Sequence, residues 1–108
     1  MPFINTWNAL QIRLRRGTVI RNWTAQNGFL GDTFTIVSVK QNYIEVDAPG
    51  AQNIQRIPQR DFQIVYNLWD DYCLGNFKRH EIRDRTRFSK YIISILHWLQ
   101  NNCGGHLP

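Results

Sequence analysis

The sequence predicts an α+β fold with an N-terminal helix, a small curled antiparallel sheet and a C-terminal helical unit whose last helix is buried. Hydrophobic residues recur at helical spacing at both ends of the chain, and short β-branched runs separated by turn residues lie between them. With 108 residues, of which 43% are hydrophobic, the chain is long enough for one core. We therefore expect a single domain, 1–108, divided into a helix (1–17), an antiparallel sheet (18–57), a helical unit (58–101) and a frayed tail (102–108).

The first helix is predicted from apolar residues three or four positions apart, namely Phe3, Trp7, Leu10 and Leu14. Asn5 or Thr6 is the expected N-cap, and Gly17 is expected to end the helix. Basic side chains near its end favour the negative pole of the helix dipole. They either stay solvated there or share in an anion-binding face, and they are Arg13, Arg15 and Arg16.

Four short strands are expected at 18–24, 33–40, 43–47 and 53–57. A glycine-containing loop, 26–32, is expected to separate the first two, and turns at 41–42 and 48–51 separate the others. In the third strand Ile44 and Val46 face the opposite way from Tyr43, Glu45 and Asp47, which is typical of a half-buried antiparallel strand. Consecutive short strands with tight turns form a meander, and we expect it to curl into an SH3-like partial barrel.

The helical unit follows Pro58, a residue that suits the first turn of a helix. Its first helix has an apolar stripe that ends before Gly75 and consists of Phe62, Val65, Tyr66, Trp69, Tyr72 and Cys73. Cys73 is therefore expected to be buried. A short helix, 79–84, comes next, and Thr86 or Ser89 is expected to cap the last helix. That last helix is apolar nearly all round, so it should lie in the middle of the protein.

Most of the charge lies in one segment between two of these helices. Six basic residues of the segment 78–90, here called the basic segment, face only Glu81 and Asp84, which gives a local net of +4 out of the chain's +5. The six are Lys78, Arg79, Arg83, Arg85, Arg87 and Lys90. Concentrated positive charge attracts anionic partners, and we expect these residues to bind nucleic-acid phosphates. The alternatives are a solvated surface with local ion pairs, or an anionic protein partner.

The sequence offers little for catalysis, a cofactor or a metal. It has no nucleophile turn and no phosphate-cradling glycine loop, and Asp70 and Asp71 lie off the apolar stripe, where they are solvated. Cys73 and Cys103 have no metal-binding spacing, and Cys103 with His106 would supply only two ligands. We expect a non-enzymatic protein without cofactor or metal. With no signal peptide and no apolar run long enough to span a bilayer, it is expected in the cytoplasm.

Aromatic side chains give the second class of function. Trp23 and Tyr43 lie on predicted strands, where an outward-facing ring could stack on a nucleobase. His97, next to a tryptophan on the apolar last helix, is expected to be a core or rim residue. The competing hypothesis is a structural or adaptor protein that self-associates, or binds a protein partner, through an aromatic surface.

Residues 57–100 also carry a recognisable pattern. It runs Ile-Pro-x-x-Asp-Phe-x-x-Val-Tyr (57–66), Trp69, Tyr72, Gly75, Arg79-x-Glu81-Ile82 and Thr86-Arg87-x-Ser89-x-Tyr91 onward to Leu96. The pattern resembles the C-terminal part of small uncharacterised bacterial proteins carried by mobile elements, including integron gene cassettes, and the tails of restriction-associated proteins. The resemblance implies a cytoplasmic bacterial protein with a tilt toward nucleic acids. It includes no catalytic motif and assigns no functional residue.

Overall fold

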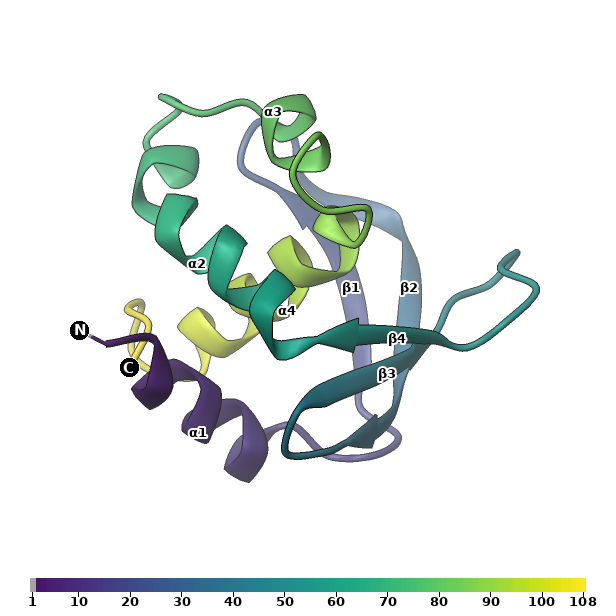
Figure 1. The fold of residues 1–108 in the computed structure, drawn as a ribbon. Helices are drawn as coiled ribbons and strands as arrows, with labels where there is room; N and C mark the ends of the chain where they lie inside the picture. Colours follow the sequence, from purple (N-terminus) through teal and green to yellow (C-terminus); the bar gives the residue numbers. More distant parts are fainter. Residues whose placement is uncertain (1) are drawn as a thin grey trace.

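The computed structural model describes residues 2–108 and has the α+β architecture that the sequence predicts (Figure 1). Helices flank and cover a four-stranded sheet. In chain order the elements are α1 (Phe3–Arg13), β1 (Val19–Thr24), β2 (Gly28–Val39), β3 (Tyr43–Asp47), β4 (Gln55–Pro58), α2 (Gln59–Cys73), α3 (Arg79–Arg83) and α4 (Ser89–Asn101). None of the helices within the described part of the chain has the length and apolar character needed to cross a bilayer.

The sheet is an antiparallel meander in the order β1-β2-β3-β4. The long strand β2 pairs with β1 along its first part and with β3 along its last part. The strand register shifts between Arg21 and Trp23 and again between Ile36 and Ser38, and such bulges bend a strand. As a result β3 and β4 run across the direction of β1 and β2 (Figure 1). The sheet stays open, with β1 and β4 as its two edges.

Two strand boundaries differ from the prediction. β2 begins at Gly28, so most of the segment expected to be a loop is strand. The reason is the tight turn after β1, which brings Thr24 opposite Gly28 and lets pairing begin at once. Gly28 has a φ of 70°, a conformation that favours glycine. β4 begins at Gln55 rather than at 53.

The last helix lies at the centre of the molecule, as the sequence predicts. α4 contacts β1 and all three other helices (Figure 1). Ile92, Ile95, Leu96 and Leu99 are fully buried. A recognition helix has to expose one whole face to the major groove, and a helix packed in this way does not, which removes α4 as a DNA-recognition helix.

The two chain ends pack together, and this corrects the predicted cap and the predicted frayed tail. α1 begins at Phe3 with Pro2 as N-cap, so neither Asn5 nor Thr6 caps it. Instead the buried Thr6 hydroxyl donates a hydrogen bond to the carbonyl oxygen of Pro108, at 2.8 Å. Arg13 donates to the carbonyl of Asn102, at 2.9 Å, and Leu107 packs against the core. Residues 102–108 thus contact α1 and the core through these partners.

Cys73 is exposed, which corrects its expected burial. The buried face of α2 consists of Phe62, Val65, Trp69 and Tyr72. Neighbouring residues on a helix are rotated by about 100° from each other. Because Tyr72 fills the core, Cys73 at the end of the helix faces outward.

Candidate nucleic-acid interface

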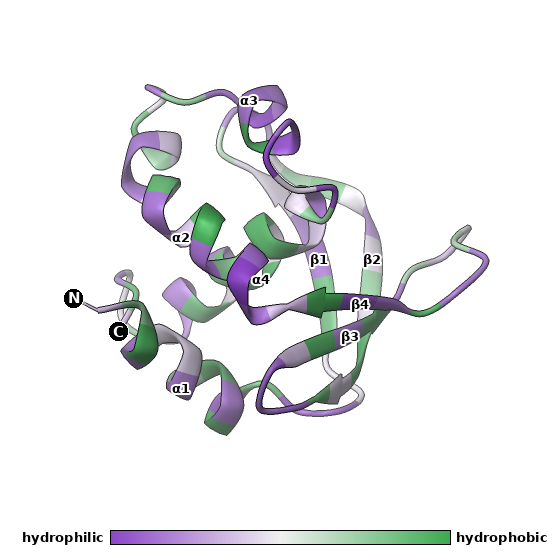
Figure 2. Ribbon diagram, viewed as in Figure 1, coloured by the Kyte–Doolittle hydropathy of each residue, from purple (hydrophilic) through white to green (hydrophobic). Residues whose placement is uncertain are grey.

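The basic segment forms the connection from α2 through α3 to the start of α4. It lies at one end of the molecule and is mostly hydrophilic (Figure 2). Four of its residues are buried and attach it to the core, namely Ile82, Thr86, Phe88 and Ser89. The basic side chains lie between and around these anchors, so the segment is held in place while its charges point away from the core.

Thr86 is the polar anchor of the segment. Its hydroxyl donates a hydrogen bond to Asp61 Oδ2 of α2, at 2.7 Å, and accepts one from the backbone N–H of Phe88, at 3.1 Å. α4 itself begins at Ser89 with Phe88 as its N-cap and without a side-chain cap. The expected capping by Thr86 or Ser89 is therefore wrong. Thr86 accepts a hydrogen bond from the backbone N–H of Phe88, the N-cap residue, and not from an N–H inside the helix. The hydrogen bond to Asp61 ties the segment to α2.

The alternation of anchors and basic residues decides where the six predicted site residues lie. Lys78, Arg83, Arg85 and Arg87 are exposed, and Arg79 and Lys90 are half-buried. Arg85 lies over the ring of Phe77, with 5.3 Å between the guanidinium carbon and the ring centre, and Arg87 lies over Phe88, at 4.7 Å. A ring face supports a guanidinium without cancelling its charge. These arginines are thus positioned but still available to an anion.

The electrostatics of the segment are unusual because opposite charges are near in sequence but not paired. The salt bridges within residues 2–108 are Arg56–Glu45, Arg60–Asp61 and Lys90–Asp32. Glu81 and Asp84 pair with none of the segment's basic side chains over this part of the chain. The local ion pairs of one alternative interpretation are therefore not formed.

Lys90 is the exception among the six. Its Nζ lies 2.9 Å from Asp32 Oδ2 on β2. The hydrogen bond from Lys90 lowers the pKa of the Asp32 carboxyl below its usual value. Five basic residues of the segment remain without a carboxylate partner in the described structure: Lys78, Arg79, Arg83, Arg85 and Arg87.

A small cavity lies where the basic segment meets the β1–β2 turn. Its volume is about 240 Å³. Lys78, Arg79 and His80 line it on one side, and the amide side chains of Gln26 and Asn27 line it on the other. All of these groups can donate hydrogen bonds to the oxygens of an anion. The sequence could not indicate this cavity, because it joins residues some fifty positions apart.

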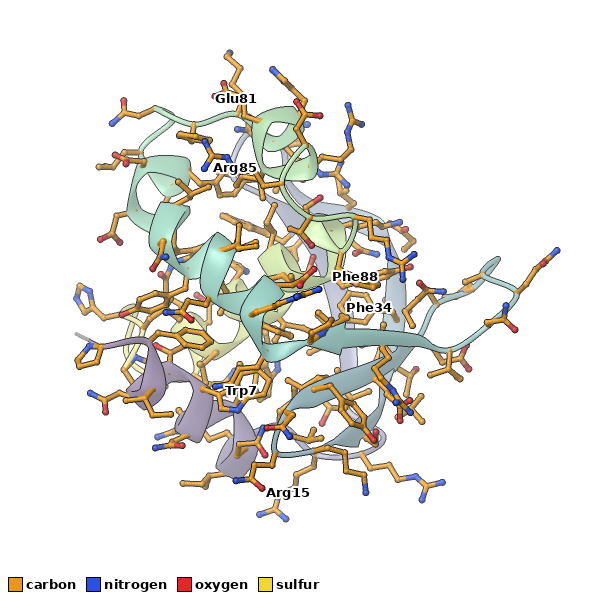
Figure 3. All side chains as sticks on the ribbon, viewed as in Figure 1. Trp7, Arg15, Phe34, Glu81, Arg85 and Phe88 are labelled. Carbon is orange, nitrogen blue, oxygen red and sulfur yellow. The ribbon has the colours of Figure 1, made fainter. Side chains whose placement is uncertain are left out.

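The arginines near the end of α1 belong to a different surface. Arg15 and Arg16 line a groove with Lys40, between α1 and the end of β2. Arg15 and Arg85 lie at opposite ends of the molecule (Figure 3). These arginines therefore do not belong to the same face as the basic segment, and both are exposed to solvent.

The two strand rings considered above as possible stacking platforms are covered by other side chains. Trp23 is half-buried and stacks on the imidazole of His97, with 3.8 Å between ring centres and 5° between the planes. Tyr43 is half-buried beneath the guanidinium of Arg56, at 4.2 Å. The exposed ring on this sheet is Phe29, with 50% of its surface accessible. Sequence reasoning missed Phe29 because the segment around it was expected to be a loop.

In residues 2–108 no three His, Cys, Asp or Glu side chains come together as metal ligands would. Comparison of the chain with protein-family models, curated proteins and solved structures gives no match. The resemblance of residues 57–100 to mobile-element proteins stays a prediction.

Proposed function

We propose that this protein is a small non-enzymatic binding protein that contacts nucleic-acid phosphates through the basic segment. One observation carries the proposal. Lys78, Arg79, Arg83, Arg85 and Arg87 have no carboxylate partner in residues 2–108, although Glu81 and Asp84 lie among them. Clustered cations repel one another unless an anion lies between them, and a phosphate backbone supplies a row of such anions.

The binding expected from this surface positions nucleic acid without reading its sequence. Arginine and lysine contacts to phosphate carry no base information. Because most side chains of α4 are buried in the core, the fold offers no recognition helix to the major groove. Such a role suits a cytoplasmic protein, and the resemblance to mobile-element proteins agrees with it.

Salt dependence tests the electrostatic origin of the binding. The affinity for duplex DNA should fall steeply with salt, with a log–log slope of about −0.9 for each phosphate contacted. The competing function, self-association or protein binding through an apolar surface, predicts a nearly flat salt dependence. Large exposed apolar residues include Ile4 and Ile12 on α1 and Leu74 after α2.

A charge-matched pair of triple variants tests the location. Arg83→Ala, Arg85→Ala and Arg87→Ala together should weaken binding by a similar factor for every sequence and reduce the salt slope by about 1 for each phosphate that is no longer bound. The control is Arg15→Ala, Arg16→Ala and Lys40→Ala, which removes the same charge at the other end of the molecule and should bind nearly as wild type. The proposal fails if wild type shows no binding at low salt, or if both variants weaken binding equally.

A further inference from the structure

A second cavity lies between the edge strand β1 and helix α4, and we call it the α4–β1 groove. Its volume is about 330 Å³, within the range of sites that take small molecules. The residues that define it are Val19, Arg21, Phe29, His97, Trp98 and Asn101. Rings and aliphatic groups dominate this lining, with a cation and an amide at its rim, whereas the cavity beside α3 has no aliphatic or large aromatic residue in its lining.

The aromatic wall of the groove is fixed in place and partly exposed. His97 is stacked on Trp23 and meets the edge of Phe29, with 5.4 Å between the ring centres. Partial burial lowers the pKa of His97, so its imidazole is neutral near pH 7 and adds no charge to the wall. Phe29 completes the wall with half of its surface accessible. A flat ligand would therefore meet a prearranged ring.

Arg21 adds a cation to this wall. Its Nε donates a hydrogen bond to the carbonyl of Leu30, at 3.1 Å, and its guanidinium lies over the Phe29 ring, at 5.0 Å from the ring centre. Arg21 forms no salt bridge with any residue between 2 and 108. An exposed ring beside an uncompensated guanidinium is chemically complementary to a base that carries a phosphate.

The groove is joined to the basic segment through a short stretch of β2. Arg21 binds the carbonyl of Leu30, and Lys90, in the first turn of α4, binds the carboxylate of Asp32. His97 follows Lys90 by two turns of the same helix, about 10 Å along its axis. A nucleic-acid strand bound to the basic segment would therefore have to extend only a short way to reach the groove.

We propose that the α4–β1 groove takes an unpaired nucleobase of a single-stranded nucleic acid, stacked on Phe29 with Arg21 at its phosphate. The inference rests on the proposed function and narrows it to the single-stranded form. Bases stack on aromatic side chains whatever their identity, which fits a protein that does not read sequence. In a duplex the bases are paired and stacked on each other, so a duplex leaves the groove empty and uses only the basic segment.

The test compares a thymidine oligonucleotide with a duplex of the same length, each titrated against the protein at low salt. Wild type should bind the single strand more tightly than the duplex. Phe29→Ala should weaken single-strand binding roughly tenfold or more and leave duplex binding unchanged, since each stacked base contributes substantially to affinity. Phe29→Trp should retain the preference because it keeps a ring. Ile12→Ala, at another exposed apolar residue, is the matched control and should bind as wild type.

Three outcomes would overturn the inference in distinguishable ways. If both nucleic acids bind but Phe29→Ala changes neither affinity, or changes both equally, the groove takes no base while the proposed function stands. If thymidine monophosphate binds as tightly as the oligonucleotide, the groove is a site for free nucleotides. If wild type binds neither nucleic acid, the proposed function and the inference fail together. Phe29 is half exposed, so a melting curve that matches wild type should accompany each measurement.

Discussion

The hydroxyl of Ser94 on α4 accepts a hydrogen bond from the backbone N–H of Trp23 on β1, with 3.0 Å between nitrogen and oxygen. Asn22 lies beside this contact, opposite residues 30–32 of β2, where the extra residues of β2 interrupt the pairing of the two strands. The Ser94 proton can go to the carbonyl of Lys90, at 3.1 Å, or to Asn22 Oδ1, at 3.4 Å. Helix α4 thus supplies a hydrogen-bond acceptor to a backbone N–H of the edge strand β1, at the point where the pairing of β1 with β2 is interrupted. The helix also covers β1 at this point.

Ser94→Ala should destabilise the protein by about 1–3 kcal/mol, because it leaves the Trp23 N–H without a partner near the core. Ser89→Ala is the matched control: Ser89 is a buried serine of the same helix whose hydroxyl makes no hydrogen bond within residues 2–108. Urea unfolding of both variants measures the difference. Equal losses of stability would mean that the Ser94–Trp23 hydrogen bond contributes nothing specific.

Ile95→Asp should unfold the protein, because the residue is fully buried and an unpaired carboxylate there is among the most costly single changes. Ile95→Val, which removes one methylene group, should cost only about 1 kcal/mol. Circular dichroism with thermal melting separates the two. A cooperatively melting Ile95→Asp protein would place α4 at the surface and contradict the fold.

Thr86→Val should loosen the basic segment from α2. It keeps the shape of the side chain but removes the hydrogen bonds to Asp61 and from the Phe88 N–H, at an expected cost of about 1–3 kcal/mol. Thr86→Ser retains the hydroxyl and should be destabilised much less. Amide hydrogen exchange over residues 79–90 is the direct measurement, since faster exchange there is expected for the valine variant alone. Unchanged exchange would show that Ile82 and Phe88 hold the segment without Thr86.

His97 should make stability fall at mildly acidic pH. Burial lowers its pKa in the folded protein below the usual value of about 6.5, so the unfolded chain binds the proton more readily. The contribution of the neutral imidazole is therefore fully present above about pH 6.5 and is lost as pH falls below that value. The side chains that His97 contacts, Trp23, Phe29 and Asn101, do not titrate in this range.

His97→Phe keeps a ring on Trp23 and removes the titration. As pH is lowered from about 7.5 to about 5.5, wild type should lose stability relative to the variant. Urea unfolding at several pH values measures the difference in unfolding free energy. A pH-independent difference would show that His97 is free to take up a proton in the folded state.

The location of the basic charge could be predicted from the sequence, but its availability could not. The spacing of Arg83, Arg85 and Arg87 indicated exposed side chains, and all three are exposed. Whether they pair with Glu81 and Asp84 depends on the turn between α3 and α4, where the burial of Thr86 and Phe88 sets the directions of their neighbours. The α4–β1 groove was beyond prediction, because its lining comes from two strands and a helix far apart in the chain.

The sequence by itself determined the order and type of the elements, the burial of α4 and the segment that carries the charge. These properties are local, since a run of isoleucines and leucines at helical spacing requires burial whatever lies against it. Only the tertiary structure decided that Trp23 is covered while Phe29 is exposed, and that the tail packs against α1. These outcomes rest on contacts between residues far apart in the chain, of Trp23 with His97 and of Thr6 with Pro108, the latter pair 102 positions apart. Local periodicity carries no information on such pairs, because the packing of the whole chain selects them.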